Sequence, residues 1–199
     1  MVTIDDVLGF WFGSGVDDAA VAAEKAGLWW DKSSEVDRVC TERFGDDLAL
    51  AADGGLDDWA ERARGRLALI VLLDQLSRNI HRQTPAAFAQ DAAARRLCHD
   101  GLGLGHDRAL RCVERVFFYM PLEHSELLAD QKLSVKCYQS LLAAAGDDFR
   151  EVCRGNLDYA CRHLHIIERF GRFPHRNAIL GRTSTREEAD FLEEPGSSF

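Results

Sequence analysis

Long apolar runs are scarce in this 199-residue sequence, and the longest spans only residues 67–73. A membrane-spanning helix needs about 20 consecutive apolar residues, so we expect no membrane association. No basic region followed by an apolar stretch opens the chain, which predicts a cytoplasmic protein without a secretory signal. With 46% hydrophobic and 29% charged residues, the composition is typical of a globular protein.

Motifs of familiar sites are missing as well. The six cysteines include no C-x-x-C pair, so we expect reduced thiols that pack as small apolar side chains. H-E-x-x-H, Walker A and G-x-S-x-G patterns are absent, and no glutamate stands three residues before a histidine. The sequence predicts neither a cofactor nor a metal ion. One alternative stays open, a metal held by His124, His163 and carboxylates of different helices.

Basic residues are outnumbered and unevenly placed. The formal net charge of −9 argues against a general nucleic-acid binder. Residues 1–61 hold fifteen Asp or Glu and four Lys or Arg, whereas residues 162–182 hold five arginines, one glutamate, three histidines and no lysine. Arginine without lysine favours bidentate recognition of a carboxylate or phosphate. These arginines could therefore bind an anion, or pair with the acidic N-terminal part of the chain.

Alternation typical of strands is absent, and the hydrophobic pattern is helical nearly throughout. We expect helices from a capping box at Thr3 through Trp11, over 17–27, from Ser33 or Ser34 to Leu50, over 56–80, from Pro85 to about Cys98, and over 107–119, 122–144, 147–170 and 185–193. A glycine-rich loop at 101–105 and a break at Pro121 interrupt this pattern. Neither a repeat near 34 residues nor a Pro- or Ser-rich linker is present. The predicted fold is all-α, with antiparallel helix pairs stacked in a compact α-α array and a single domain over residues 1–199.

Polar residues directly continue the longest apolar run. On a regular helix, Asp74, Arg78 and His81 fall on the same face as the apolar residues before them. A carboxylate and a guanidinium on a core-facing stripe must be paired or line a cavity, because unpaired burial costs several kcal/mol. Asp74 is therefore a candidate catalytic residue, and Arg78 and Arg82 are candidate ligand-binding residues. A structural ion pair is the alternative.

Histidines stand at two further candidate positions. If Pro121 begins a new helix, His124 and Glu126 lie in its first turns. On the helix expected over 147–170, His163 shares an apolar stripe, while His165 points to the opposite side and into solvent. We take His124 and His163 as catalytic candidates and Glu126 as a ligand-binding candidate. Helix capping by Glu126 and core packing of the histidines are the alternatives.

Further cations follow the end of that helix. Gly171 suits a helix C-terminus, and Arg172, His175 and Arg176 come directly after it. Arg182 precedes three hydroxyl residues that can cap a last helix. These four cationic or titratable residues are candidates for binding an anionic ligand, and a packed C-terminal clasp is the alternative.

Four motifs in this order resemble the bacterial domain-of-unknown-function family 924. They are LGFWF at 8–12, DQLSRN at 74–79, FFYMPLEHSE at 117–126 and FGRFPHRN at 170–177, and the closing LGRTST at 180–185 fits as well. The resemblance implies an all-α fold of the tetratricopeptide-like class and no established activity. Leu76 and Ser77 depart from the aromatic residue and proline that the family commonly has after Asp-Gln.

Three functions fit these residues. In a small-molecule site, the arginines would hold an anionic group and a histidine with a carboxylate would act as general base or acid. A non-enzymatic helical module would instead bind a peptide or a partner protein in a groove. In the third hypothesis, the polar residues only fix the helix packing. Oligomeric state is left open, because Trp11, Trp29 and Trp30 suit either a core or an interface.

Overall fold

Side-chain caps begin the first three helices of the computed structural model, which describes residues 1–197. Thr3 and Asp6 form the expected capping box, and the side chains of Asp17 and Ser33 cap the next two helices. Such caps satisfy backbone N–H groups that have no partner within the helix. The three helices are α1 (Ile4–Phe12), α2 (Asp18–Trp30) and α3 (Ser34–Ala52).

A continuous helix of buried residues follows and runs through the centre of the molecule. Its parts are α4 (Ala63–Ile70), the π-helical segment η2 (Val71–Leu76) and α5 (Ser77–Ile80), preceded by the 3-10 turn η1 (Asp57–Glu61). Residues 65–77 are all buried, as the apolar run predicts. The π turn is a departure from the expected regular helix, and such turns inside α-helices often occur at functional sites.

The glycine-rich loop predicted at 101–105 is wrong. Helix α6 (Asp91–Leu104) continues through it, and only Gly105 leaves the helix, with a φ of 71°. Gly101 is needed because a Cβ there would lie 2.5 Å from Phe118 and 2.6 Å from Arg66. The glycine thus allows α6 to pack closely against its neighbours. Pro85 begins only the short 3-10 turn η3 (Pro85–Phe88) and not the helix through Cys98.

The break predicted at Pro121 is wrong as well. After the 3-10 turn η4 (His106–Ala109), helix α7 (Cys112–Glu123) contains Pro121 in its interior. A proline there removes one backbone hydrogen bond without ending the helix when the surrounding packing holds it. His124 consequently stands at the C-terminal end of α7 instead of in the first turn of the next helix.

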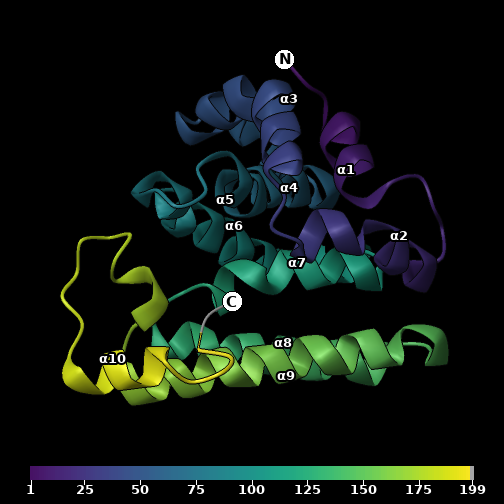
Figure 1. Cartoon of the computed structure of the whole chain (residues 1–199). Helices are drawn as coiled ribbons and strands as arrows, with labels where there is room; N and C mark the ends of the chain where they lie inside the picture. The colour runs from purple at the N-terminus through teal and green to yellow at the C-terminus, as the bar shows by residue number, and fades with distance from the viewer. Residues whose placement is uncertain (198–199) are drawn as a thin grey trace.

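The two longest C-terminal helices form an antiparallel pair along the lower edge of Figure 1. They are α8 (Leu128–Ala144) and α9 (Asp147–Phe170), and a connection this short makes consecutive helices antiparallel neighbours. Around the C-terminal end of α9 lie η5 (Pro174–Arg176) and α10 (Arg186–Leu192). Thr185 caps α10, as expected.

One hydrophobic core joins the helices from α1 to α9. Among its largest fully buried side chains are Trp11, Phe44, Phe117 and Tyr138. The described part of the chain is all-helical, as predicted, and the tetratricopeptide-like arrangement stays a prediction. No helix within residues 1–197 is long and apolar enough to cross a membrane. Residues 198 and 199 of the predicted domain lie outside the described residues.

Candidate functional site

Asp74 is fully buried at the π-helical turn and accepts hydrogen bonds from three side chains. Nδ1 of His124 lies 2.8 Å from Oδ1 and 2.9 Å from Oδ2. Gln75 Nε2 donates to Oδ2 at 2.5 Å, and Arg78 Nη2 donates to Oδ1 at 3.3 Å. Burial alone would raise the pKa of Asp74, but His124 and Arg78 outweigh it and hold this pKa below its usual range. The carboxylate therefore stays ionised although it has no contact with water.

His124 turns its ring from the end of α7 towards this carboxylate. Burial and the nearby charge of Arg78 lower the pKa of His124, so the imidazole is uncharged near neutral pH. Because Nδ1 faces a carboxylate, Nδ1 carries the proton and the lone pair lies on Nε2. The side chain is 17% exposed, whereas that of Asp74 is 0% exposed. A buried carboxylate that orients a partly exposed imidazole is the arrangement by which enzymes prepare a histidine for proton transfer.

Two arginines reach the same place from different parts of the chain and share Asp91. Arg78 Nη1 donates to Asp91 Oδ1 at 3.0 Å, and Arg176 Nη1 donates to Asp91 Oδ2 at 3.2 Å. Arg176 is only 6% exposed and lies between the rings of Phe88 and Phe173, at 4.8 and 4.6 Å from their centroids. Burial lowers the pKa of Arg176 to about 10, which leaves the guanidinium charged at neutral pH. Two aspartates thus balance two arginines.

His163 approaches from α9, with its ring centroid 6.5 Å from that of His124. Its Nδ1 donates to the carbonyl of Tyr159 at 2.9 Å and lies 3.3 Å from Oε1 of Glu123. Burial lowers the pKa of His163 to about 3 and raises that of Glu123 to about 8. Both groups are therefore uncharged near neutral pH. Burial and Arg176 also lower the pKa of His175 to about 4, so its imidazole is uncharged too.

The segment after α9 is held over these residues by a clasp of charged hydrogen bonds. Glu126 accepts from the backbone N–H of Phe173 at 2.8 Å and from Arg182 at 2.8 and 3.0 Å. Arg172 donates to Glu188 at 2.6 and 2.7 Å. Gly171 makes the sharp turn out of α9 with a φ of 68°, a value that favours glycine. The clasp holds the segment from which Arg176 contacts Asp91 of α6 and Phe88 of η3.

The structure thus separates the predicted site residues into three places. We name the first the histidine–arginine cluster; with Asp91, which it adds, its members are Asp74, Arg78, Asp91, His124, His163, His175 and Arg176. The clasp contains Glu126, Arg172 and Arg182. Arg82 lies apart, since its guanidinium donates to Asp37 of α3 at 2.5 and 2.7 Å.

The inward and outward assignment of the two α9 histidines is confirmed: His163 is buried and His165 is exposed. The sequence also left open that the C-terminal arginines pair with the acidic N-terminal part of the chain. Four of these arginines do not. Arg169, Arg172, Arg176 and Arg182 pair with carboxylates that lie outside residues 1–61, namely Glu187, Glu188, Asp91 and Glu126.

The sequence analysis missed two carboxyl groups, Asp91 within the cluster and Glu123 beside it. Glu123 precedes His124 in the same motif, so its position next to a candidate was a usable signal. Asp91 had no comparable signal, because a carboxylate in the first turn of a helix is explained by the helix dipole alone.

Two cavities of about 440 Å³ each lie away from the cluster and are bordered by α1 and α3.

Within residues 1–197, no group of three or more His, Cys, Asp or Glu side chains is arranged to hold a metal ion.

Comparisons with known proteins agree with this architecture. A family described as "Bacterial protein of unknown function (DUF924)" matches residues 7–196. The structure of the protein of unknown function ATU0120 from Agrobacterium tumefaciens is 39% identical in sequence, with a TM-score of 0.75, and the match covers 89% of this chain and 99% of that chain. No curated protein matches the chain. The chain belongs to the DUF924 family of bacterial proteins.

Proposed function

We propose that the histidine–arginine cluster binds a small anionic ligand and that His124 exchanges a proton with it. The observation that carries this proposal is the pair of Asp74 and His124. A carboxylate with 0% exposure holds Nδ1 of an uncharged imidazole whose side chain is 17% exposed. An imidazole in this state can accept a proton on Nε2 near neutral pH, and Asp74 then stabilises the imidazolium that forms.

The guanidinium of Arg176 supports the anionic character of the ligand. Its Nε is buried and has no hydrogen-bond partner among the described residues. A buried donor without a partner costs about 1–3 kcal/mol, which a ligand oxygen that accepts from Arg176 would recover. Guanidinium groups bind carboxylates and phosphates through strong charge-assisted hydrogen bonds. Arg176 is therefore the side chain that we expect to hold the anionic group.

Charge balance links the bound anion to the proton on His124. Arg78 and Arg176 are already balanced by Asp74 and Asp91, so a ligand brings an uncompensated negative charge. A nearby anion favours the charged form of an imidazole and raises its pKa. When the anion binds, Nε2 of His124 can therefore take up a proton from solvent and donate it to the ligand, and the proton returns to solvent when the ligand leaves.

Thermal unfolding with defined anions tests the proposal. The probes are inorganic phosphate, sulfate, acetate and succinate, applied to wild type, His124→Gln and His163→Ala. His165→Gln is the matched control because His165 is exposed on the outer face of α9. A ligand at about 100 times its Kd stabilises by about 2.7 kcal/mol, or roughly 5–10 °C in Tm for a chain of this size.

We expect at least one probe to raise the Tm of wild type and of His165→Gln and to have little effect on the two cluster variants. If no probe shifts wild type, or if all four proteins shift equally, the cluster serves helix packing and binds no such anion. A second readout follows the imidazole signals by nuclear magnetic resonance. The pKa of His124 should rise when the probe is bound, as the charge balance requires.

A further inference from the structure

The seam between α1 and α3 carries the two cavities of about 440 Å³, one on each side of Arg43. The first is lined by carboxylates, among them Asp6, Asp46 and Asp47. The second has a floor of half-buried apolar side chains: Phe10, Leu28, Val36 and Val39. We call this surface the α1–α3 groove. It combines an acidic end with an apolar end, and none of its residues belongs to the histidine–arginine cluster.

The length of the α1–α3 groove fits a short helix. Along α3 its lining residues run from Glu35 to Asp47. At 1.5 Å per residue this distance is about 18 Å, the length of a helix of about 12 residues. Amphipathic helices bind other proteins by placing their apolar face in an apolar groove.

Charge complementarity indicates what kind of helix would bind there. Residues 1–61 hold fifteen acidic and four basic residues, so the acidic residues are in excess by eleven. At the groove, Glu24 pairs with Lys25, and Glu35 and Glu42 both pair with Arg38. The carboxylates of Asp6 and Asp46 add to the acidic end. Arg43 is exposed between the two cavities, with its guanidinium 4.8 Å from the ring centroid of Phe10. An acidic surface of this kind attracts a basic partner and repels an acidic one.

We infer that the α1–α3 groove binds a basic amphipathic helix of a partner protein. An apolar side chain of the helix would lie on Phe10 and Val39, and a lysine or arginine would lie at the acidic end beside Asp46. This inference is independent of the proposed anion site, because the two surfaces share no residue.

A designed peptide pair tests the inference by fluorescence anisotropy. The probe is a labelled 14-residue helix of leucine and lysine, with leucines spaced three and four residues apart, and its counterpart has glutamate in place of every lysine. Gly9 lines the apolar cavity, and a Cβ there would meet no atom within 4 Å. Gly9→Phe therefore fills the groove without straining the chain. Gly103→Phe is the matched control, since Gly103 is an exposed helical glycine of α6 with the same open space.

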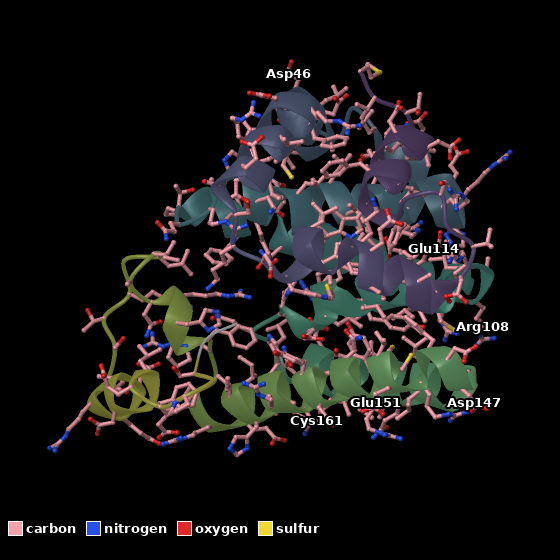
Figure 2. All side chains as sticks on the ribbon, turned by 45° about the vertical axis from the view of Figure 1, so that its right-hand side comes forward. Asp46, Arg108, Glu114, Asp147, Glu151 and Cys161 are labelled. Carbon is pink, nitrogen blue, oxygen red and sulfur yellow. The ribbon has the colours of Figure 1, made fainter. Side chains whose placement is uncertain are left out.

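A charge reversal tests the acidic end. Asp46→Lys changes the groove, and Glu151→Lys makes the same change in charge on α9. Figure 2 shows Asp46 on α3 at the top of the view and Glu151 on α9 near the bottom. Circular dichroism of each variant checks that the helices remain folded.

The expected result is binding of the Leu/Lys peptide that weakens about tenfold in Gly9→Phe and about threefold in Asp46→Lys, with the two controls within about twofold of wild type. The Leu/Glu peptide should not bind. The inference is overturned if the Leu/Lys peptide does not bind wild type, or if it binds Gly9→Phe as tightly as wild type. The second outcome would show that general attraction to an acidic surface, and not the groove, holds the peptide.

Discussion

Arg38 on α3 and Arg176 after α9 both pair with carboxylates, but in different surroundings. Arg38 contacts Glu35 and Glu42, and all three side chains are more than half exposed. Arg176 is 6% exposed and shares the carboxylate of Asp91 with Arg78. Exposed pairs contribute little to stability, whereas removal of one partner from a buried set leaves an uncompensated charge. The exposed charges of α3 therefore add little to the stability of the fold, whereas the charges around Arg176 are part of its buried structure.

The largest effect that separates the two regions is expected at Asp74. Asp74→Asn removes the carboxylate that accepts from His124 and Arg78, at a residue with 0% exposure. We expect the free energy of unfolding to fall by about 3–5 kcal/mol, the usual result of breaking a buried ion pair. Urea denaturation measures it. A loss below about 1 kcal/mol would mean that water reaches the cluster and that the contrast between the regions is smaller than its burial indicates.

The second largest effect concerns the pH dependence of stability at Glu123. Its pKa rises from 4.5 to about 8 on folding because the carboxyl is buried. Between these pH values the folded state keeps a proton that the unfolded chain releases, so stability falls as the pH rises from 4.5 to 8. Glu123→Gln removes this titration, so we expect its free energy of unfolding to change by about 3–4 kcal/mol less than that of wild type between pH 5 and 8.

His163 provides the counterpart with the opposite sign. Its pKa falls from 6.5 to about 3, so the unfolded chain takes up a proton that the folded state does not, and stability is lost as the pH falls below 6.5. His163→Gln should reduce the loss of stability below pH 6.5. Between pH 6.5 and 8, its free energy of unfolding should change with pH as in wild type. Parallel pH profiles for wild type and both variants would contradict the burial of these two groups.

A smaller effect is expected at the clasp. Glu126→Gln weakens the hydrogen bonds to Arg182 and to the backbone of Phe173 at a side chain that is 29% exposed. We expect a loss of about 1–2 kcal/mol, together with roughly tenfold faster amide exchange within residues 171–185 as this segment opens. Glu187→Gln is the control, since Glu187 pairs with Arg169 where both side chains are exposed. Equal exchange in the two variants would show that the clasp does not hold the segment.

The smallest effect is expected in the acidic region. Arg38→Gln breaks both exposed pairs on α3, and the free energy of unfolding should hardly change, because exposed ion pairs contribute little. Moderate salt should remove even this difference, because exposed charges are screened. A loss of stability as large as that of Asp74→Asn would contradict the difference between exposed and buried ion pairs.

The parts of the cluster that depend on local spacing were predictable from the sequence. Arg78 follows Asp74 by four positions, and the helical wheel of α9 correctly buried His163 and exposed His165. These assignments need only the period of the α-helix. The arginines of residues 162–182 indicated a charged C-terminal region, and four of them form ion pairs.

The parts that depend on tertiary packing were not predictable. Gly101 looks like a loop residue until Phe118 and Arg66 are placed against it, and Pro121 looks like a helix break until the buried α7 surrounds it. Asp91 lies 17 residues beyond Asp74, and only the fold brings it to Arg78 and Arg176. Local propensity cannot supply such information, because tertiary contacts routinely override it.

The π turn in the central helix also makes the cluster sensitive to the length of the chain. Residues 71–76 are wound more loosely than an α-helix, and α5 continues directly from them. Deleting one residue from this segment would let a regular helix form and would rotate everything after it by about 100°. Arg78 would then turn away from Asp91, while the apolar composition of the helix would hardly change. The number of residues in this one turn thus determines which side chains lie next to His124.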